Sequence, residues 1–179
     1  MDDRELVRQA QDGDPQAYGR LVELHQPRIY ATLAKITGDR ELALDLTQDA
    51  FIRAWEALDG FERRSAFSTW LYRIAVRLAY DALRRQPYRG DADISETLAD
   101  SVPRPDERAA ADDEAAELRR RIDALPEMQR AVLVLRAWDG LPYREIAGIL
   151  GTSEGSARVS FHHAITRLRA TYAGETKAR

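Results

Sequence analysis

Apolar residues recur three and four positions apart along nearly the whole chain, a periodicity typical of amphipathic α-helices. The alternating pattern that marks β-strands is almost absent. The helical pattern stops from Gln86 to about Asp112, where QPYRGDADISETLADSVPRPDERAAAD contains three prolines and no apolar face. We therefore expect an all-α protein with two small helical domains, at residues 1–86 and 114–175, joined by a flexible acidic linker at 87–113.

Helix ends in the first domain are marked by capping residues. Aspartate suits the position before a helix, proline suits the first helical position, and glycine suits the position after the last. Pro27 lies inside the first predicted helix and could kink or split it. The three predicted helices run from Asp14-Pro15 to Ile36, ended by Gly38; from Asp39 to Leu58, broken at Asp59-Gly60; and from about Ala66 to Arg85, ahead of Pro87.

The second domain contains a helix-turn-helix pattern in YREIAGILGTSEGSARVSFHHAITRLR (143–169). The turn Gly151-Thr152 joins helices predicted at Pro142–Leu150 and Ser153–Tyr172, with Ser153 as the N-cap. In such motifs the second helix enters the DNA major groove. An ordinary helical hairpin with a polar outer face is the alternative. The outward face holds Arg158, Val159, Ser160, His162, His163 and Thr166.

Charge is unevenly distributed, although the net charge is only −3. Residues 63–85 carry six arginines and one acidic residue, and Trp70, Arg73 and Arg77 share one side of the predicted helix. Arginine binds phosphate and an aromatic ring stacks on an unpaired base, so this stripe fits single-stranded or melted DNA. A solvated arginine face, with Trp70 at the edge of the core, is the alternative.

The preceding helix has an acidic face that also contains large apolar residues. Asp45 and Asp49 share this face with Ile52, and Trp55 lies near its end. Interface cores favour aromatic residues, so this face suggests a protein partner. An ordinary solvated face is the alternative.

Several functional classes are disfavoured. The chain has no cysteine, and its three histidines lack the spacing of a metal-binding helix. No apolar stretch approaches the ~20 residues of a membrane span, and the N-terminus does not resemble a secretory signal. We expect a soluble cytoplasmic protein without catalytic residues, metal, cofactor, membrane insertion or small-molecule substrate.

Three segments resemble, in order, the signatures of an extracytoplasmic-function (ECF) sigma factor of the sigma-70 family. They are DLTQDAFIRAWEAL (45–58), FSTWLYRIAVRLAYDALRR (67–85) and LPEMQRAVLVLRAWDGLPYREIAGILGTSEGSARV (125–159), so the resemblance covers nearly the whole chain. Members have two helical domains, numbered 2 and 4, joined by a flexible linker. The resemblance implies a non-enzymatic factor that binds core RNA polymerase, recognises promoter DNA, helps to melt it and is regulated by an anti-sigma factor.

The resemblance also implies roles for individual positions. Contacts with core polymerase are expected from Asp45, Gln48, Asp49, Ile52, Arg53 and Trp55. Melting and capture of the minus-ten element are expected from Arg63, Arg64, Ser65, Phe67, Ser68, Thr69, Trp70, Arg73 and Arg77. Reading of the minus-thirty-five element is expected from Tyr143, Arg144, Ser153, Glu154, Ser156, Arg158, Val159, Ser160, His162, His163 and Thr166.

Two segments depart from the family pattern. Many relatives read IARNLALD where this chain has IAVRLAYD, so Arg77 replaces an asparagine whose amide could read a base edge. Relatives commonly show a lysine-serine-arginine run followed by HRAR, where this chain has Arg158-Val159-Ser160-Phe161 followed by His162-His163-Ala164-Ile165, so fewer fixed positive charges face the DNA. Histidine has an ordinary pKa of ~6.5, so these positions predict weaker, pH-sensitive phosphate binding.

Two other functions are compatible with parts of the chain. A conventional helix-turn-helix repressor or activator would explain residues 118–172 but leave the first 85 without a role. A sigma-like decoy for an anti-sigma protein would not need the basic stripe around Trp70. An enzyme is the weakest alternative, because the acidic residues form no recognisable site.

Overall fold

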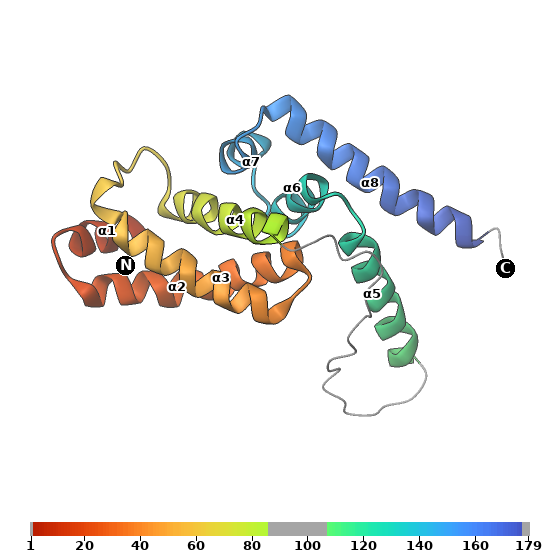
Figure 1. Ribbon diagram of the computed structural model, residues 1–179, viewed down its shortest axis with the longest axis horizontal. Coiled ribbons are helices and arrows are strands. Elements are labelled where there is room, and N and C mark those ends of the chain that lie inside the picture. The colour runs from red at the N-terminus through yellow and green to blue at the C-terminus, as the bar shows by residue number, and fades with distance from the viewer. Residues whose placement is uncertain (1, 86–106, 177–179) are drawn as a thin grey trace.

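The computed structural model describes residues 2–85 and 107–176, and within them every regular element is a helix (Figure 1). The expected all-α class is confirmed for this part of the chain. Most of the expected linker, residues 87–106, lies outside the described residues. The elements are α1 (Asp3–Gln11), α2 (Pro15–Thr37), α3 (Arg40–Glu56), the 3-10 helix η1 (Leu58–Gly60), α4 (Phe67–Arg85), α5 (Glu107–Asp123), α6 (Glu127–Ala137), α7 (Tyr143–Leu150) and α8 (Glu154–Thr176).

The predicted helix caps are confirmed. The Asp14 carboxylate accepts a hydrogen bond from the backbone N–H of Gln16 at 2.8 Å, and the Asp39 carboxylate caps α3 in the same way. Gly38 adopts a left-handed conformation with a φ of 71° at the end of α2, which a residue with a Cβ rarely adopts. Pro27 does not split α2, which continues to Thr37.

Two helix boundaries differ from the expectation. α5 begins at Glu107, inside the segment assigned to the linker, because its first turns are rich in alanine and glutamate, which favour helices without an apolar stripe. α1 was not predicted. It is a short amphipathic helix whose Leu6, Val7 and Ala10 are buried, so tertiary packing stabilises it.

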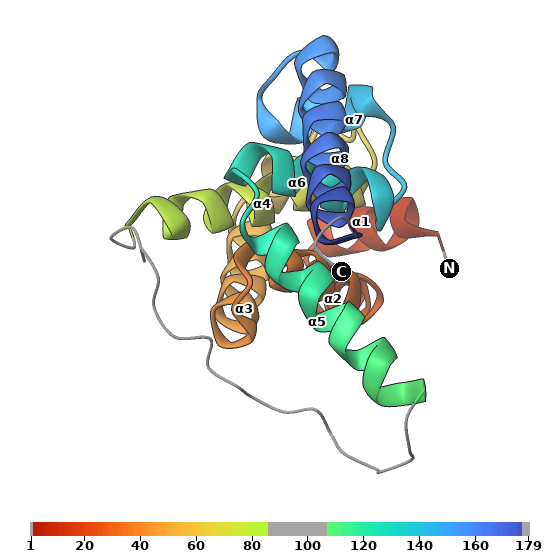
Figure 2. The same ribbon diagram turned by 90° about the vertical axis from the view of Figure 1, so that its right-hand side faces the viewer.

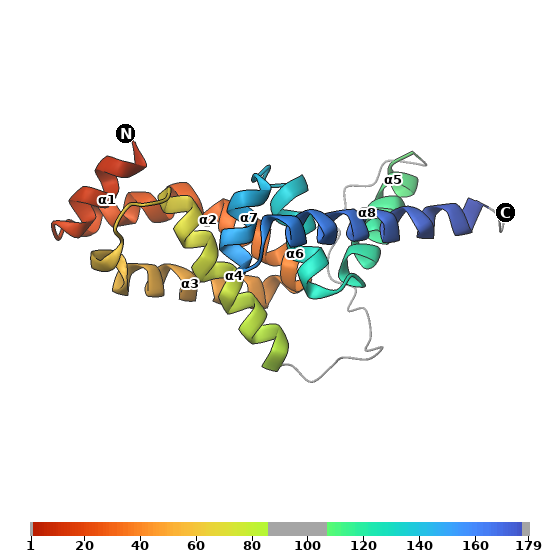
Figure 3. The same cartoon turned by 90° about the horizontal axis from the view of Figure 1, so that it is seen from above.

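Helices α1 to α4 pack into one bundle around a shared apolar core. Leu21 and Leu33 of α2 and Leu71 of α4 are completely buried. The central α2 contacts each of the other three helices, and α3 and α4 cross on one side of it (Figure 3). This arrangement leaves the outer faces of α3 and α4 for other contacts.

The C-terminal helices are organised around α6. Its residues 130–135 are all buried, because α6 lies between α8 on one side and α2 on the other. Leu133 packs with Ile122, Leu125 and Ala164 in a smaller core of the C-terminal half. α5 projects away from this body, as Figure 2 shows.

The two halves pack directly against each other. α7 lies on α4, and α6 lies on α2 (Figure 1). One continuous apolar core joins Val132 and Leu135 of α6 and Ile146 of α7 to the core of α1 to α4. The sequence alone gave no indication of this contact.

Candidate protein and nucleic-acid interfaces

The outer face of α3 is exposed and acidic. α3 buries Ala43, Leu46, Ala50 and Ala54 against the bundle, and the helical repeat turns the intervening residues outward. Ile52 is 56% exposed and Trp55 is 42% exposed, which is unusual for such large apolar side chains. The structure brings the whole sequence-predicted set to one exposed surface: Asp45, Gln48, Asp49, Ile52, Arg53 and Trp55.

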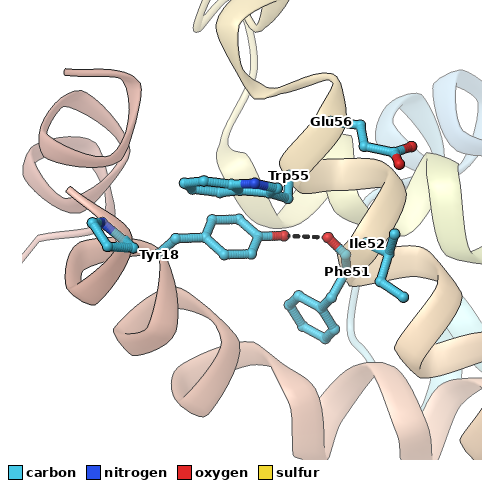
Figure 4. Close-up of a pocket in the computed structure, with 6 residues that line it drawn as sticks. Tyr18, Phe51, Ile52, Trp55 and Glu56 are labelled. Carbon is cyan, nitrogen blue, oxygen red and sulfur yellow. Dashed lines mark hydrogen bonds between the residues drawn. The ribbon is translucent and has the colours of Figure 1, made fainter. Parts of the chain in front are cut away.

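A hollow of about 360 Å³ lies between the end of α3 and the start of α2 (Figure 4). The Tyr18 ring lies under the Trp55 indole, with 4.7 Å between the ring centroids. The Tyr18 hydroxyl donates to the Phe51 carbonyl at 2.5 Å, and burial raises the pKa of this hydroxyl, so it remains a donor at neutral pH. The residues that line the hollow are Pro15, Tyr18, Phe51, Ile52, Trp55 and Glu56.

Among these lining residues, sequence analysis missed Pro15, Tyr18 and Phe51. Pro15 and Tyr18 are far from α3 along the chain, and only the packing of α2 on α3 brings them to Trp55. The signal in the sequence that pointed to this surface was the presence of Ile52 and Trp55, two large apolar residues, on an otherwise acidic helix face. The arrangement offers an open apolar socket beside carboxylates, a surface suited to a partner helix with an apolar anchor and basic neighbours.

Trp70 belongs to an aromatic cluster at the start of α4. Its ring stacks on Phe61, with 4.7 Å between centroids and 26° between planes. Phe67, predicted to contact DNA, is only 3% exposed and packs between Phe61, Trp70 and His25. Phe67 therefore supports Trp70 from within the core, and Trp70 itself is partly exposed.

The loop before α4 presents its arginines to solvent. Arg63 has a φ of 57°, a left-handed conformation uncommon outside glycine. Arg64 is largely exposed and pairs with Glu62 at 2.7 Å. Ser65 and Ser68 are partly buried beside this loop. The loop thus presents two guanidinium groups next to the Trp70 cluster.

Farther along α4 the predicted residues divide into two groups. Arg73 and Arg77 are exposed on its outer side. Thr69 is buried, and its hydroxyl donates to the Glu145 carboxylate of α7 at 2.9 Å. A second hollow of about 320 Å³ lies between α3 and α4, and both Arg53 and Arg77 line it, although sequence analysis assigned them to different contacts. It is lined by Arg53, Ala57, Ile74, Arg77, Leu78 and Asp81.

The outward face of α8 is exposed as expected. Ser153 caps the helix by accepting from the Ser156 backbone N–H at 3.0 Å. Val159 is 54% exposed, while Ser160 is partly buried. The other predicted side chains that are exposed here and on α7 are Arg144, Ser153, Glu154, Ser156, Arg158, His162, His163 and Thr166.

Arg158 is held in place by two neighbours. Its guanidinium pairs with Glu154 at 2.6 Å and lies 4.8 Å from the centre of the Tyr143 ring. Arg136 lies 4.9 Å from the same ring centre. Tyr143 is thus positioned by packing, with its edge toward Phe161, and it orients Arg158 rather than standing free.

Two negative findings hold for the part of the chain that the structure describes. His, Asp and Glu side chains form no group of three that could hold a metal ion. No helix combines the length and apolar character needed to cross a bilayer.

Comparison with protein families matches both halves of the chain. Sigma-70 region 2 matches residues 21–87, and Sigma-70, region 4 matches residues 115–168. The first match covers α3 and α4, and the second covers the helix-turn-helix of α7 and α8.

Three relatives are similar over most of their length. The RNA polymerase sigma-H factor of Pseudomonas aeruginosa is 34% identical over 87% of this chain and 86% of its own. The ECF RNA polymerase sigma factor SigW of Bacillus subtilis is 31% identical over 93% and 94%. The ECF RNA polymerase sigma-E factor of Escherichia coli K12 is 34% identical over 88% and 87%.

Two solved structures share the fold. CnrH in complex with the cytosolic domain of CnrY superposes with a TM-score of 0.74 at 27% identity, covering 96% of this chain and 97% of CnrH. The sigma factor RpoE in complex with the anti-sigma factor NepR, from Bartonella quintana, has a TM-score of 0.68 at 21% identity, covering 86% and 94%. The second likeness concerns the fold alone.

Proposed function

Because this chain belongs to the ECF sigma factors of the sigma-70 family, we propose that it binds core RNA polymerase through α3, melts the minus-ten element with α4 and its preceding loop, and reads the minus-thirty-five element with α8. The polymerase performs the chemistry, since a sigma factor is not an enzyme. The observation that carries the proposal is the exposed acidic and aromatic face of α3, on the same bundle as the basic loop and Trp70.

Transcription with core RNA polymerase and a genomic-fragment library tests this function. We expect discrete start sites that depend on the protein, and we expect Asp49→Arg to reduce their yield about 10- to 100-fold. The reason is that a like charge placed opposite a basic partner surface costs several kcal/mol. Run-off transcript yield at saturating DNA is the measurement.

Glu23→Arg is the matched control for that experiment. It reverses an exposed charge on α2, a different helix from the one that carries the proposed polymerase contacts, and should leave transcript yield unchanged. Equal losses in both variants would argue against a specific contact at Asp49. DNA binding by the folded protein without any transcripts would instead favour the repressor or decoy function.

In the minus-ten region, the aromatic cluster suits a stack for an extruded base, since bases stack on an exposed ring with little sequence preference. Arg63, Arg64, Arg73 and Arg77 supply positive charge around it. Arg77 stands where relatives have an asparagine, so we propose that it contacts phosphate and that the preferred minus-ten sequence differs from theirs.

In the minus-thirty-five region, replacing His162 and His163 by arginine should strengthen binding. Two permanent charges on the exposed face of α8 would each neutralise a phosphate, so we expect about tenfold tighter binding near neutral pH and a salt slope steeper by up to ~2. Filter binding of the holoenzyme to a duplex recovered from the transcription experiment measures both.

The control for this pair of substitutions is Glu23→Gln with Gln26→Arg, which changes the net charge by the same +2 at exposed positions of α2. If that variant binds DNA as tightly as the histidine variant, general charge rather than α8 accounts for the gain. Unchanged affinity and salt slope in the histidine variant would exclude these two positions from phosphate binding.

The domain boundaries and the partners complete the proposal. We assign residues 1–86 to sigma domain 2, 87–113 to the linker and 114–175 to sigma domain 4. An anti-sigma factor is proposed as a partner, since membership of the ECF family implies one and the 27% identical CnrH was solved in complex with another protein, the cytosolic domain of CnrY. The repressor alternative leaves the exposed face of α3 without a role.

A further inference from the structure

The turn between α6 and α7 is inserted into the first half of the molecule. Its Asp139 carboxylate lies 2.9 Å from the Thr32 hydroxyl of α2 and 3.0 Å from the Tyr72 hydroxyl of α4. Arg28 approaches the same residue twice, with Nε 3.3 Å from the carboxylate and Nη2 donating to the backbone carbonyl at 2.6 Å. One aspartate thus accepts from three side chains on two helices of the other half.

This contact is shielded from water. The Asp139 side chain is only 7% exposed, whereas Arg28 keeps 54% of its side chain in solvent. Burial raises the pKa of Tyr72 to about 12, so its hydroxyl stays protonated and remains a donor. A carboxylate in such a setting needs all its partners, because an unpaired buried charge is costly.

A second set of contacts covers the start and middle of α4. Thr69 donates to Glu145 of α7 at 2.9 Å. The Arg73 guanidinium reaches Gly148 of α7 so closely that a Cβ at that glycine would lie 2.7 Å from Nη2. Both α4 residues belong to the proposed minus-ten set, so α7 occupies part of the surface that the DNA would use.

The outward face of α8 remains exposed in the same arrangement. The two proposed DNA surfaces are therefore unequal in this state, with one open to solvent and the other partly covered. The polar contacts of Asp139 stabilise the arrangement in which the two halves are packed together, and they are lost when the halves separate.

We propose that Asp139 is an autoinhibitory latch, which holds α7 on α4 so that Thr69 stays buried and the guanidinium of the otherwise exposed Arg73 stays against Gly148 until the two halves separate. The effect on DNA binding rests on the proposed function. The contact that holds the two halves together does not depend on it. Opening increases the fraction of molecules competent to bind single-stranded DNA, and the apparent affinity rises with that fraction.

Spin labels can test the latch, because the chain contains no cysteine. Nitroxides on Glu41→Cys and Arg169→Cys, both exposed and in different halves, report the separation by double electron–electron resonance. We expect one narrow distance distribution in the labelled parent and a broader, longer one after Asp139→Ala. A short fluorescein-labelled single-stranded DNA of mixed sequence should bind Asp139→Ala roughly five- to tenfold more tightly than it binds the parent.

Asp59→Ala is the matched control, since Asp59-Gly60 is also an Asp-Gly turn and its aspartate is exposed. It removes the same charge, so any gain from charge alone appears in both variants. Thr32→Val with Tyr72→Phe breaks the latch from the other half without altering α6 or α7. Thermal melting shows whether each variant is folded. If Asp139→Ala does not fold, the variant with Thr32→Val and Tyr72→Phe tests the latch in its place.

A broad distribution in the parent, or an unchanged narrow one in the folded latch variants, would overturn the proposal. If the distances lengthen but DNA affinity does not rise beyond the Asp59→Ala control, the autoinhibitory role is wrong although the halves do open. The distance measurement needs no DNA or polymerase, so failure of the latch is distinguishable from failure of the proposed sigma function.

Discussion

Trp55→Ala should lower the affinity for core RNA polymerase by about 30- to 1,000-fold, equivalent to ~2–4 kcal/mol. Trp55 forms one wall of the hollow at the end of α3 and packs against the Tyr18 ring at a tilt of 54°. An exposed indole above an apolar socket is the kind of residue on which interface energy concentrates. Removing it also deprives the partner's apolar anchor of its main contact surface.

Fluorescence anisotropy of labelled protein titrated with core polymerase measures this loss. Leu24→Ala is the control, since Leu24 is 58% exposed on α2 and does not line the hollow. Thermal melting separates lost binding from lost folding, because Tyr18 packs against Trp55. Wild-type affinity in folded Trp55→Ala would exclude the hollow as the main polymerase contact.

Trp70→Ala should reduce open-complex formation by about 5- to 150-fold while leaving polymerase affinity unchanged. The reason is that stacking on an aromatic side chain contributes ~1–3 kcal/mol per base. Trp70 is suited to this role because its ring is held in place by stacking on Phe61 and by packing against Phe67. Permanganate reactivity of melted thymines, with promoter and holoenzyme held at fixed concentrations, measures the effect.

Trp70→Phe is the companion variant, because it keeps an aromatic face at the same place. We expect it to retain most of the melting activity, within a few-fold of the parent. If both substitutions were equally damaging, Trp70 would act through the aromatic packing of the protein rather than by stacking on a base. If neither had an effect, base capture would have to be assigned elsewhere in the loop or on α4.

Local features of the chain were predictable from sequence because they depend on neighbours in the chain. Asp14, Asp39 and Ser153 cap helices as predicted, since a capping side chain bonds to backbone only two or three residues away. α1 was missed because it is short and depends on burial of Leu6 against other helices. The residues with an exposed face on α3 and α8 were also predictable, because helical spacing decides which residues share a face.

Tertiary structure alone decided which faces meet. Sequence analysis assigned Phe67 and Thr69 to DNA contacts, but the fold buries Phe67 among aromatic rings and pairs Thr69 with Glu145. It also joined Tyr18 to Trp55 across 36 intervening residues and placed Asp139 against Arg28 and its neighbours. The spacing of apolar residues predicts that one face of a helix will be buried. Which element covers that face depends on packing between segments that are distant in the chain.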